Sequence, residues 1–325
     1  MTRILSALLI LLFVGPNPWA DTRRPIWNTT QAISAARVVI PGGHFGPLEI
    51  IEAWDLTSPH SGFGGWSAMA LTGDRQFLLV SDAGHIARFG LGSDGRIADA
   101  QISPLLWSRT SRKRDRDAEA MWRDPASGQS WIAFEGSNRI MRLDPSLTRT
   151  IGDARPWEMR RWSANGGPEA MTRLADGRFL MLAEAANTRT LGTAGILYPG
   201  DPTDSGREDH VRFGYRSWGM GRLTDAATLP DGRVLLLHRQ ISLWRWFTST
   251  LAIGDPAGIA DNQSWTAAPL AAIGQPQLSD NFEALAIAPH PRGISIWLAS
   301  DDNFNRLQRN LLIHLLLPWD ALPPR

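Results

Sequence analysis

Short runs of apolar residues alternate with turn-forming residues along almost the whole chain. After an apolar N-terminal segment, these runs have the length of β-strands, and Gly, Pro and Asp bound them. This pattern is typical of strands, because an amphipathic helix needs a longer segment with a period of 3.6 residues. The sequence therefore predicts an all-β protein.

Five segments share one order of features. Each begins with a small polar or acidic residue, continues with a short apolar strand and a turn rich in Asp, Gly and Pro, and ends with a second apolar strand. A third strand-length run follows every segment. The segments are WSAMALTGDRQFLLVSD from Trp66, AEAMWRDPASGQSWIAFE from Ala118, PEAMTRLADGRFLMLAE from Pro168, TDAATLPDGRVLLLHRQ from Thr224 and FEALAIAPHPRGISIWLASDD from Phe282.

The spacing of these segments predicts a β-propeller. Their first polar positions, taken as Ser67, Glu119, Glu169, Asp225 and Glu283, are 52, 50, 56 and 58 residues apart. Four-stranded propeller blades repeat at roughly this distance, about 40 to 50 residues. Asp-Gly turns, as in ADGR and PDGR, are strong hairpin signals. We count five blades, and six remain open if ARVVI from Ala36 begins a divergent blade.

The last unit ends without a fourth strand, whereas a strand-like run stands ahead of the first unit. That run is LEIIEAWDLT, residues 48–57. We expect it to complete the last blade and close the ring, which removes an exposed sheet edge.

The N-terminus has the pattern of a secretory signal. Arg3 precedes an apolar stretch of 11 residues, Ile4 to Val14, which is too short to span a bilayer, and Ala20 is a plausible cleavage position. We expect a signal peptide over 1–20, an N-terminal extension over 21–47 and one propeller domain over 48–325. The expected location is periplasmic or secreted, with no stable membrane insertion after cleavage.

The composition narrows the kinds of partner and of active site that we expect. With 33 basic and 32 acidic residues the net charge is only +1, so nucleic acid is not an expected partner. The absence of cysteine excludes disulfides, thiolate zinc sites and a cysteine nucleophile. No Gly-x-Ser-x-Gly motif is present, which argues against a serine hydrolase. The oligomeric state stays open.

Acidic residues stand where first strands begin and second strands end. In a propeller these two positions share one face, so the carboxylates converge there. Like charges that close need compensation, for which calcium, arginine and protonation are all open. A purely structural role, in which the acids accept hydrogen bonds from interblade turns, is also open.

The predicted site residues fall into three groups. Catalytic roles are assigned to Glu169 and Glu283. Metal-ligand roles are assigned to Glu119, Glu135, Glu184, Asp301, Asp302 and Asp82. Substrate-binding roles are assigned to Arg139, Arg306, His238 and Arg239, of which His238 and Arg239 stand with Asp225 in the fourth unit, where no acid ends the second strand.

These motifs resemble a known family. The succession WSAMAL, AEAMW, PEAMTRLADGRFLMLAE and NFEALAI, with SDDNFN before LLIHLLLP, is similar to the phytase-like, esterase-like propellers of exported bacterial proteins, over residues 48–318. The resemblance implies hydrolysis of a small phosphate ester or carboxylic ester. Similarity to propeller phytases, which hold several calcium ions, implies metal roles for Glu119, Glu169, Glu283, Asp301 and Asp302. A non-catalytic propeller that binds a small ligand or a protein is the alternative.

Overall fold

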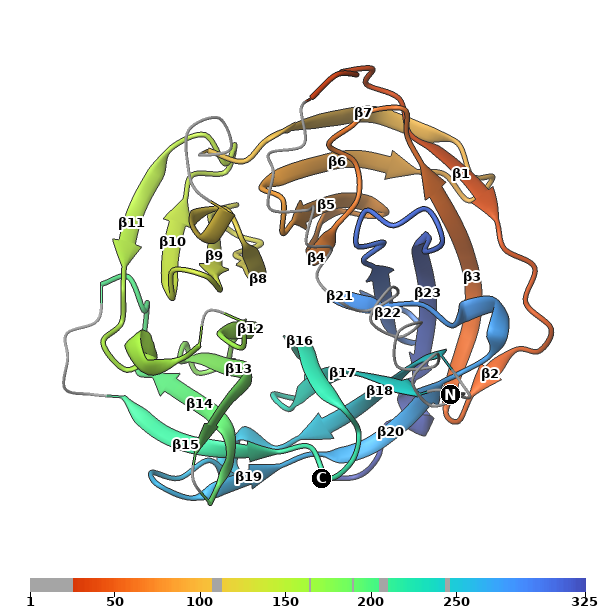
Figure 1. Ribbon diagram of the computed structural model, residues 1–325. Helices are drawn as coiled ribbons and strands as arrows, with labels where there is room; N and C mark the ends of the chain where they lie inside the picture. The colour runs from red at the N-terminus through yellow and green to blue at the C-terminus, as the bar shows by residue number, and fades with distance from the viewer. Residues whose placement is uncertain (1–25, 107–112, 164, 189, 205–209, 243–245) are drawn as a thin grey trace, which may run out of the picture.

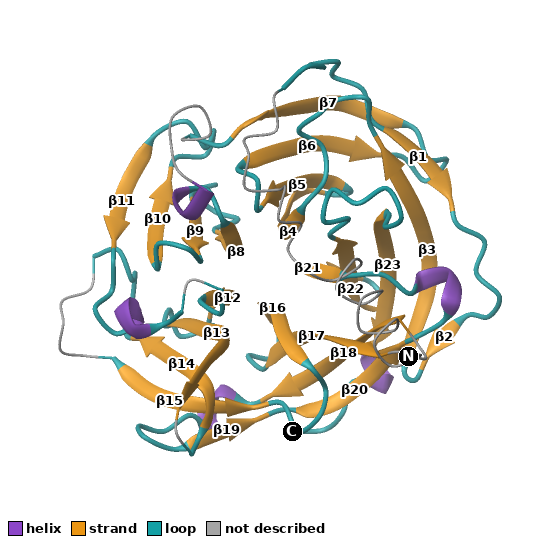
Figure 2. Ribbon diagram, viewed as in Figure 1, coloured by secondary structure: helices purple, strands orange, loops and turns teal. Residues whose placement is uncertain are grey.

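The protein is a five-bladed β-propeller with almost no helix (Figures 1 and 2). The computed structural model describes residues 26–106, 113–163, 165–188, 190–204, 210–242 and 246–325. The expected signal peptide lies outside the described residues. Within the described part of the chain, no helix is long and apolar enough to cross a membrane.

Each blade is an antiparallel sheet whose first strand lies nearest the central axis (Figure 1). Blade 1 contains β4 (Trp66–Gly73), β5 (Gln76–Ser81), β6 (His85–Leu91) and β7 (Ile97–Pro104). Blade 2 contains β8 (Ala118–Arg123), β9 (Ser130–Phe134), β10 (Arg139–Leu143) and β11 (Thr150–Ala154). Blade 3 contains β12 (Pro168–Arg173), β13 (Phe179–Thr188), β14 (Gly192–Tyr198) and β15 (Val211–Arg216), with β19 (Ser264–Thr266) parallel to β15 at its outer edge.

The last two blades complete the ring. Blade 4 contains β16 (Arg222–Thr228), β17 (Val234–Ser242), β18 (Trp246–Gly254) and β20 (Ala268–Ile273). Blade 5 contains β21 (Phe282–His290), β22 (Gly293–Ser300), β23 (Asn310–Pro318) and β3 (Leu48–Thr57), with β1 (Ser34–Arg37) and β2 (His44–Phe45) paired to β3. Short 3-10 turns are η1 (Lys113–Asp115), η2 (Met159–Arg161), η3 (Pro256–Gly258), η4 (Pro276–Leu278) and η5 (Trp319–Ala321).

The expected closure of the ring is confirmed. Strand β3 pairs antiparallel with β23, so segments from opposite ends of the chain lie side by side in blade 5, orange beside blue in Figure 1. The open question of a sixth blade is answered as well. The segment from Ala36 contributes only the end of β1, which pairs with the outer side of β3.

The hairpin turns follow from local chemistry. In the ADGR turn the Asp176 side chain accepts the amide hydrogen of Arg178, and Gly177 takes a φ of +91°. The PDGR turn repeats this with Asp231 and with Gly232 at +87°. Glycine takes this left-handed conformation without a Cβ clash, which fixes the turn.

Aromatic side chains fill the interfaces between blades. Trp122 and Trp131 of blade 2 pack against Phe179 of blade 3, with ring centroids 5.2 and 5.4 Å from Phe179. Phe77 of blade 1 meets Trp297 of blade 5 at 4.8 Å. Burial of such rings stabilises a protein without disulfides and holds the inner strands in fixed positions around the axis.

Candidate functional site

Every inner strand carries a β-bulge at the same position near its start. The register against the second strand shifts across one residue in each blade. A bulge leaves its extra residue unpaired and redirects its side chain. The five bulged residues are Ser67, Glu119, Glu169, Thr224 and Glu283.

A second ring of residues stands at the ends of the second strands. The backbone N–H groups of Asp82, Glu135, Glu184 and Asp301 each donate to the carbonyl of the residue two positions before the bulge, at 2.8–3.0 Å. Arg239 takes the corresponding place in blade 4, where it pairs with Arg222. The bulges and these strand ends therefore share one face of the propeller.

We call the carboxylates on this face the acidic mouth. Its members are Asp82, Asp117, Glu119, Glu135, Glu169, Glu184, Glu283 and Asp301. Asp117 was not singled out from the sequence, although it stands two residues before the bulged Glu119, at the place that Asn281 takes before Glu283.

Two groups of these carboxylates have the spacing of a metal site. One oxygen from each of Asp117, Glu119 and Glu135 lies within 4.8 Å of the others, and the same holds for Glu135, Glu169 and Glu184. Calcium binds carboxylate oxygens at about 2.3–2.6 Å, so two oxygens on one ion are at most about 5 Å apart. Either group therefore fits a hard divalent cation, and Glu135 belongs to both.

Burial and the crowding of like charges raise the pKa values of carboxylates in the mouth. Burial, followed by the charges of neighbouring carboxylates, raises the pKa of Glu119 and of Glu169 well above the usual range. Burial and the charge of Asp117 raise the pKa of Asp82 and of Glu135 to about 7. Without a bound cation, the mouth therefore holds protons at neutral pH.

Arg239 supplies internal compensation on one side of the mouth. Its guanidinium lies 3.0 Å from Glu283 and 3.4 Å from Glu184, and it donates to the side-chain oxygen of Asn281 at 2.6 Å. Asn281 in turn donates to Glu283 at 2.9 Å and to Asp301 at 3.3 Å. Arg222 donates to both oxygens of Glu184 at 3.0 Å.

In the fourth blade, the residue at the bulge differs from the one that the repeat predicted. The bulged residue is Thr224, not Asp225. Asp225 is buried, and its carboxylate accepts the backbone N–H groups of Ala226 and Leu285, at 2.8 and 2.7 Å. It therefore ties blade 4 to blade 5 and is no part of the mouth.

The two hydroxyl residues at bulges also connect blades. The Ser67 hydroxyl donates to the carbonyl of Ala118, and the Thr224 hydroxyl donates to that of Phe282 at 3.3 Å. Each acceptor is the residue directly before the bulged glutamate of the next blade. In blades 1 and 4, a hydroxyl residue that forms an interblade hydrogen bond thus stands where the other blades have a glutamate.

Among the proposed substrate-binding residues, Arg239 alone pairs with mouth carboxylates. The His238 ring is fully buried, with Nε2 2.7 Å from the Tyr215 hydroxyl and Nδ1 3.3 Å from the Thr250 carbonyl, and burial lowers its pKa to about 4. Arg139 forms a two-pronged ion pair with Asp153 of β11. Both therefore have structural partners.

Asp302 and Arg306 lie in the loop between β22 and β23, beside the mouth. Asp302 accepts the backbone N–H groups of Gly65 and Phe304 at 2.9 and 3.0 Å, together with the side-chain amide of Asn310 at 3.1 Å. The two residues line a separate cavity. Asp302 is thus oriented by three donors and lies at the edge of the predicted metal set.

The chain is similar to known proteins in sequence and in fold. A family model described as phytase-like, "Esterase-like activity of phytase", matches residues 61–304. No curated protein matches the chain. The solved structure of glutaminyl cyclase from Myxococcus xanthus is similar over 82% of this chain and 95% of its own, with 11% identity and a TM-score of 0.50. Hydrazine synthase from Kuenenia stuttgartiensis aligns over 76% and 79%, with 12% identity and a TM-score of 0.42. At these identities the cyclase shows a shared fold only.

Proposed function

Because the chain belongs to the phytase-like family, we propose that it is an exported hydrolase that cleaves a small phosphate ester or carboxylic ester at a calcium-binding acidic mouth. The observation that carries this proposal is the spacing of Asp117, Glu119 and Glu135. Three acidic oxygens within 4.8 Å of one another repel unless protons or a cation lie between them.

The ion is assigned to the group that does not contain Glu184. In the other group, Glu184 already pairs with Arg222 and Arg239, so we assign the ion to Asp117, Glu119 and Glu135. Bound calcium would supply Lewis-acid polarisation of an ester oxygen.

The other acids would handle protons. Hydrolysis joins a water oxygen to phosphorus or to the carbonyl carbon and breaks the bond to the departing oxygen, while one proton of the water passes by way of the acids to that departing oxygen. Glu169, whose pKa is raised well above the usual range by burial and by Glu184, is suited to donate that proton. Glu283, held by Arg239 and Asn281, is assigned to orient the attacking water.

The test is hydrolysis of phytate, p-nitrophenyl phosphate and p-nitrophenyl acyl esters by the purified protein, in calcium and in chelator. We expect turnover that requires calcium on at least one of them. Glu169→Gln should lower kcat by about 100-fold or more, since a positioned proton donor contributes that much. The matched control is Asp176→Asn, which alters an exposed turn acid paired with Arg178 and should change kcat less than about twofold.

Absence of calcium-dependent turnover on every substrate would refute the hydrolase. A specific observation then favours a second function, a propeller that binds a ligand at the mouth without cleaving it. Arg239 bridges Glu184 and Glu283 without any metal, so this side of the mouth is already compensated. In that case, calorimetry should detect ligand binding that chelator does not abolish.

A further inference from the structure

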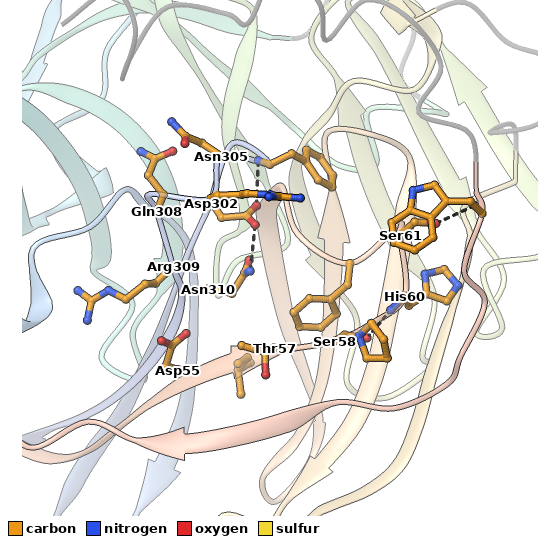
Figure 3. A pocket seen from close by; sticks show the side chains of 16 residues that line it. Asp55, Thr57, Ser58, His60, Ser61, Asp302, Asn305, Gln308, Arg309 and Asn310 are labelled. Atoms are coloured by element: carbon orange, nitrogen blue, oxygen red, sulfur yellow. Dashed lines mark hydrogen bonds between the residues drawn. The ribbon is translucent and has the colours of Figure 1, made fainter. Parts of the chain in front are cut away.

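A cavity of about 670 Å³ lies beside the acidic mouth, between blades 1 and 5. Its walls come from the end of β3, the 58–65 loop before β4, the 301–309 loop before β23, and Trp27. Figure 3 shows Asp302 and Asn310 on the wall opposite His60 and Ser61. Cavities of this size hold small organic ligands, for which about 300–1,000 Å³ is typical.

Gly65 lies between a residue of the cavity lining and a carboxylate of the acidic mouth. The backbone N–H of Gly65 donates to Asp302, which lines the cavity. A Cβ at Gly65 would lie 2.4 Å from an oxygen of Asp82, a mouth carboxylate, and 2.6 Å from the ring of Phe304. Gly64 is equally confined, since its Cβ would lie 2.6 Å from Asp302. The two glycines, both with positive φ, thus let the two sites adjoin.

The cavity offers aromatic walls. Phe63 is almost completely buried and packs edge-on against Trp66, with centroids 5.0 Å apart, so its ring is held in place. The Phe304 ring lies close to Gly65, since a Cβ built there would be 2.6 Å from the ring. Trp27 completes the lining, and its residue is 77% exposed. Rings on several sides favour a planar aromatic ligand, because stacked and edge-on aromatic pairs gain energy beyond area burial.

The lining contains two acids and two arginines, of which Arg306 is the one that we expect to pair with an anionic substituent. Asp302 already accepts three hydrogen bonds, and Arg309 pairs with Asp280 at 3.4 Å. Burial raises the pKa of Asp55, the other acid of the lining. Arg306 is exposed, and no ion pair of it is found in the described ranges of the chain. The His60 Nδ1 accepts the Gly62 N–H at 3.0 Å, which leaves Nε2 as a donor in the neutral ring.

We propose that this cavity binds the aromatic part of the substrate, an aryl group with an anionic substituent that pairs with Arg306, while the ester bond reaches over the backbone of Gly64 and Gly65 to the acidic mouth. This inference rests on the proposed function, because it names the class of ester that the mouth would hydrolyse. It favours aryl esters over inositol phosphates, which have no aromatic group to place against Trp27, Phe63 and Phe304.

The experiment separates binding from turnover by using 2-naphthoate, which contains no ester. Its affinity for the full chain is measured by calorimetry in chelator. We expect Trp27→Ala to weaken binding about tenfold, for the lost ring contact, and Arg306→Gln to weaken it about fivefold, for the lost charge-assisted contact. Controls are Trp319→Ala, an exposed residue beyond the far end of β23, and Arg96→Gln, whose side chain is 90% exposed. Neither should change the affinity.

Two competitors and one variant distinguish binding in the cavity from hydrolysis at the mouth. Cyclohexanecarboxylate and inositol hexakisphosphate should fail to displace naphthoate, and Glu169→Gln should bind naphthoate normally although its kcat is expected to be lowered. Unchanged affinity in both Trp27→Ala and Arg306→Gln, or displacement by inositol hexakisphosphate, would overturn the cavity assignment even if the protein hydrolyses esters. Localised naphthoate binding without any hydrolysis would instead refute the proposed function and leave the cavity as an aromatic-anion site.

Discussion

Glu135 occupies the centre of the candidate site because it belongs to both groups of closely spaced carboxylates. It accepts the N–H of Gly167 at 3.1 Å, which fixes its orientation, yet burial and the charge of Asp117 raise its pKa to about 7. A carboxyl group with that pKa exchanges a proton for a cation near neutral pH. In the proposed calcium site, binding of the ion would therefore be coupled to proton release at this residue.

This coupling predicts an unusual dependence of stability on pH. The folded-state pKa values of Asp82 and Glu135 lie above their unfolded values, so the stability they contribute is present at about pH 4 and is lost as the pH rises through about 7. In chelator we expect the Tm to fall by several degrees between about pH 5 and about pH 8.

Calcium should remove this fall, because the ion stabilises the ionised carboxylates. Calorimetric scans in chelator and in calcium check the prediction, and Glu135→Gln should flatten the slope in chelator. The same slope with and without calcium would show that no ion replaces the protons.

Arg239 provides the second prediction at the residue scale. Its replacement by Gln leaves Glu283 and Glu184 without their shared cation, and loss of one partner of a buried ion pair costs about 3–5 kcal/mol. Urea unfolding in chelator measures that loss. Arg222→Gln is the matched control, since its side chain is 63% exposed and such pairs contribute less than about 1 kcal/mol. Calcium should restore more stability to Arg239→Gln than to the control; equal losses in both variants would contradict the role of Arg239.

At the scale of elements, the repeated bulge determines which side chain each inner strand presents towards the central axis. Three blades place a glutamate there, and two place a hydroxyl that bonds to the carbonyl before the next glutamate. Blades 1 and 4 therefore align the glutamates of blades 2 and 5. The bulge acts as a positioning feature in these two blades and as a source of carboxylates in the others.

Removal of the hydroxyl of one bulge tests this positioning. Thr224→Val keeps the shape of the side chain but leaves the Phe282 carbonyl without that donor, so we expect a loss of about 1–2 kcal/mol of unfolding free energy in urea. Thr72→Val, at an exposed position of β4, should change it by less than about 0.5 kcal/mol. Equal effects in the two variants would mean that the interblade bond does not contribute.

At the scale of the whole molecule, ring closure depends on the N-terminal strand β3 and on a buried acid within it. Glu52 lies opposite His314 of β23 and forms an ion pair with Arg75 of the β4–β5 turn. His314 stacks on Trp297, with centroids 4.1 Å apart. This network joins blade 5 to blade 1 where the ring is closed.

Acid should weaken this closure. Burial by itself would raise the pKa of Glu52, but the His314 ring, whose Nδ1 lies 3.7 Å away, and the hydrogen bond and charge of Arg75 lower it from 4.5 to about 2. Because the folded pKa is the lower one, the stabilisation is present above about pH 4.5 and is lost towards about pH 2, a loss of about 3 kcal/mol. Urea unfolding across this range should show that slope in the wild type and not in Glu52→Gln; an identical slope in both would exclude Glu52 as its source.

Most of the fold could be predicted from the sequence because hairpins are local. The Asp-Gly turns and the length of the apolar runs specify each pair of strands, and the period of the repeat gives the blades. The site was predicted less completely. The repeat predicted the acids at strand ends. Asp117 and Asn281 lie two residues ahead of the repeated positions, so the repeat did not predict them.

The sequence by itself determined the strands, the turns, the repeated blade unit and the closing strand, since these depend on patterns within one hairpin and on its repetition. Only the tertiary structure decided which polar residue at each strand start enters the mouth. A bulge shifts the register by one residue, so Thr224 takes the position that the repeat predicted for the adjacent Asp225. The tertiary structure also decided that His238 is enclosed, that Arg239 bridges two glutamates and that Asp302 borders a cavity. Each of these depends on side chains contributed by other strands and blades.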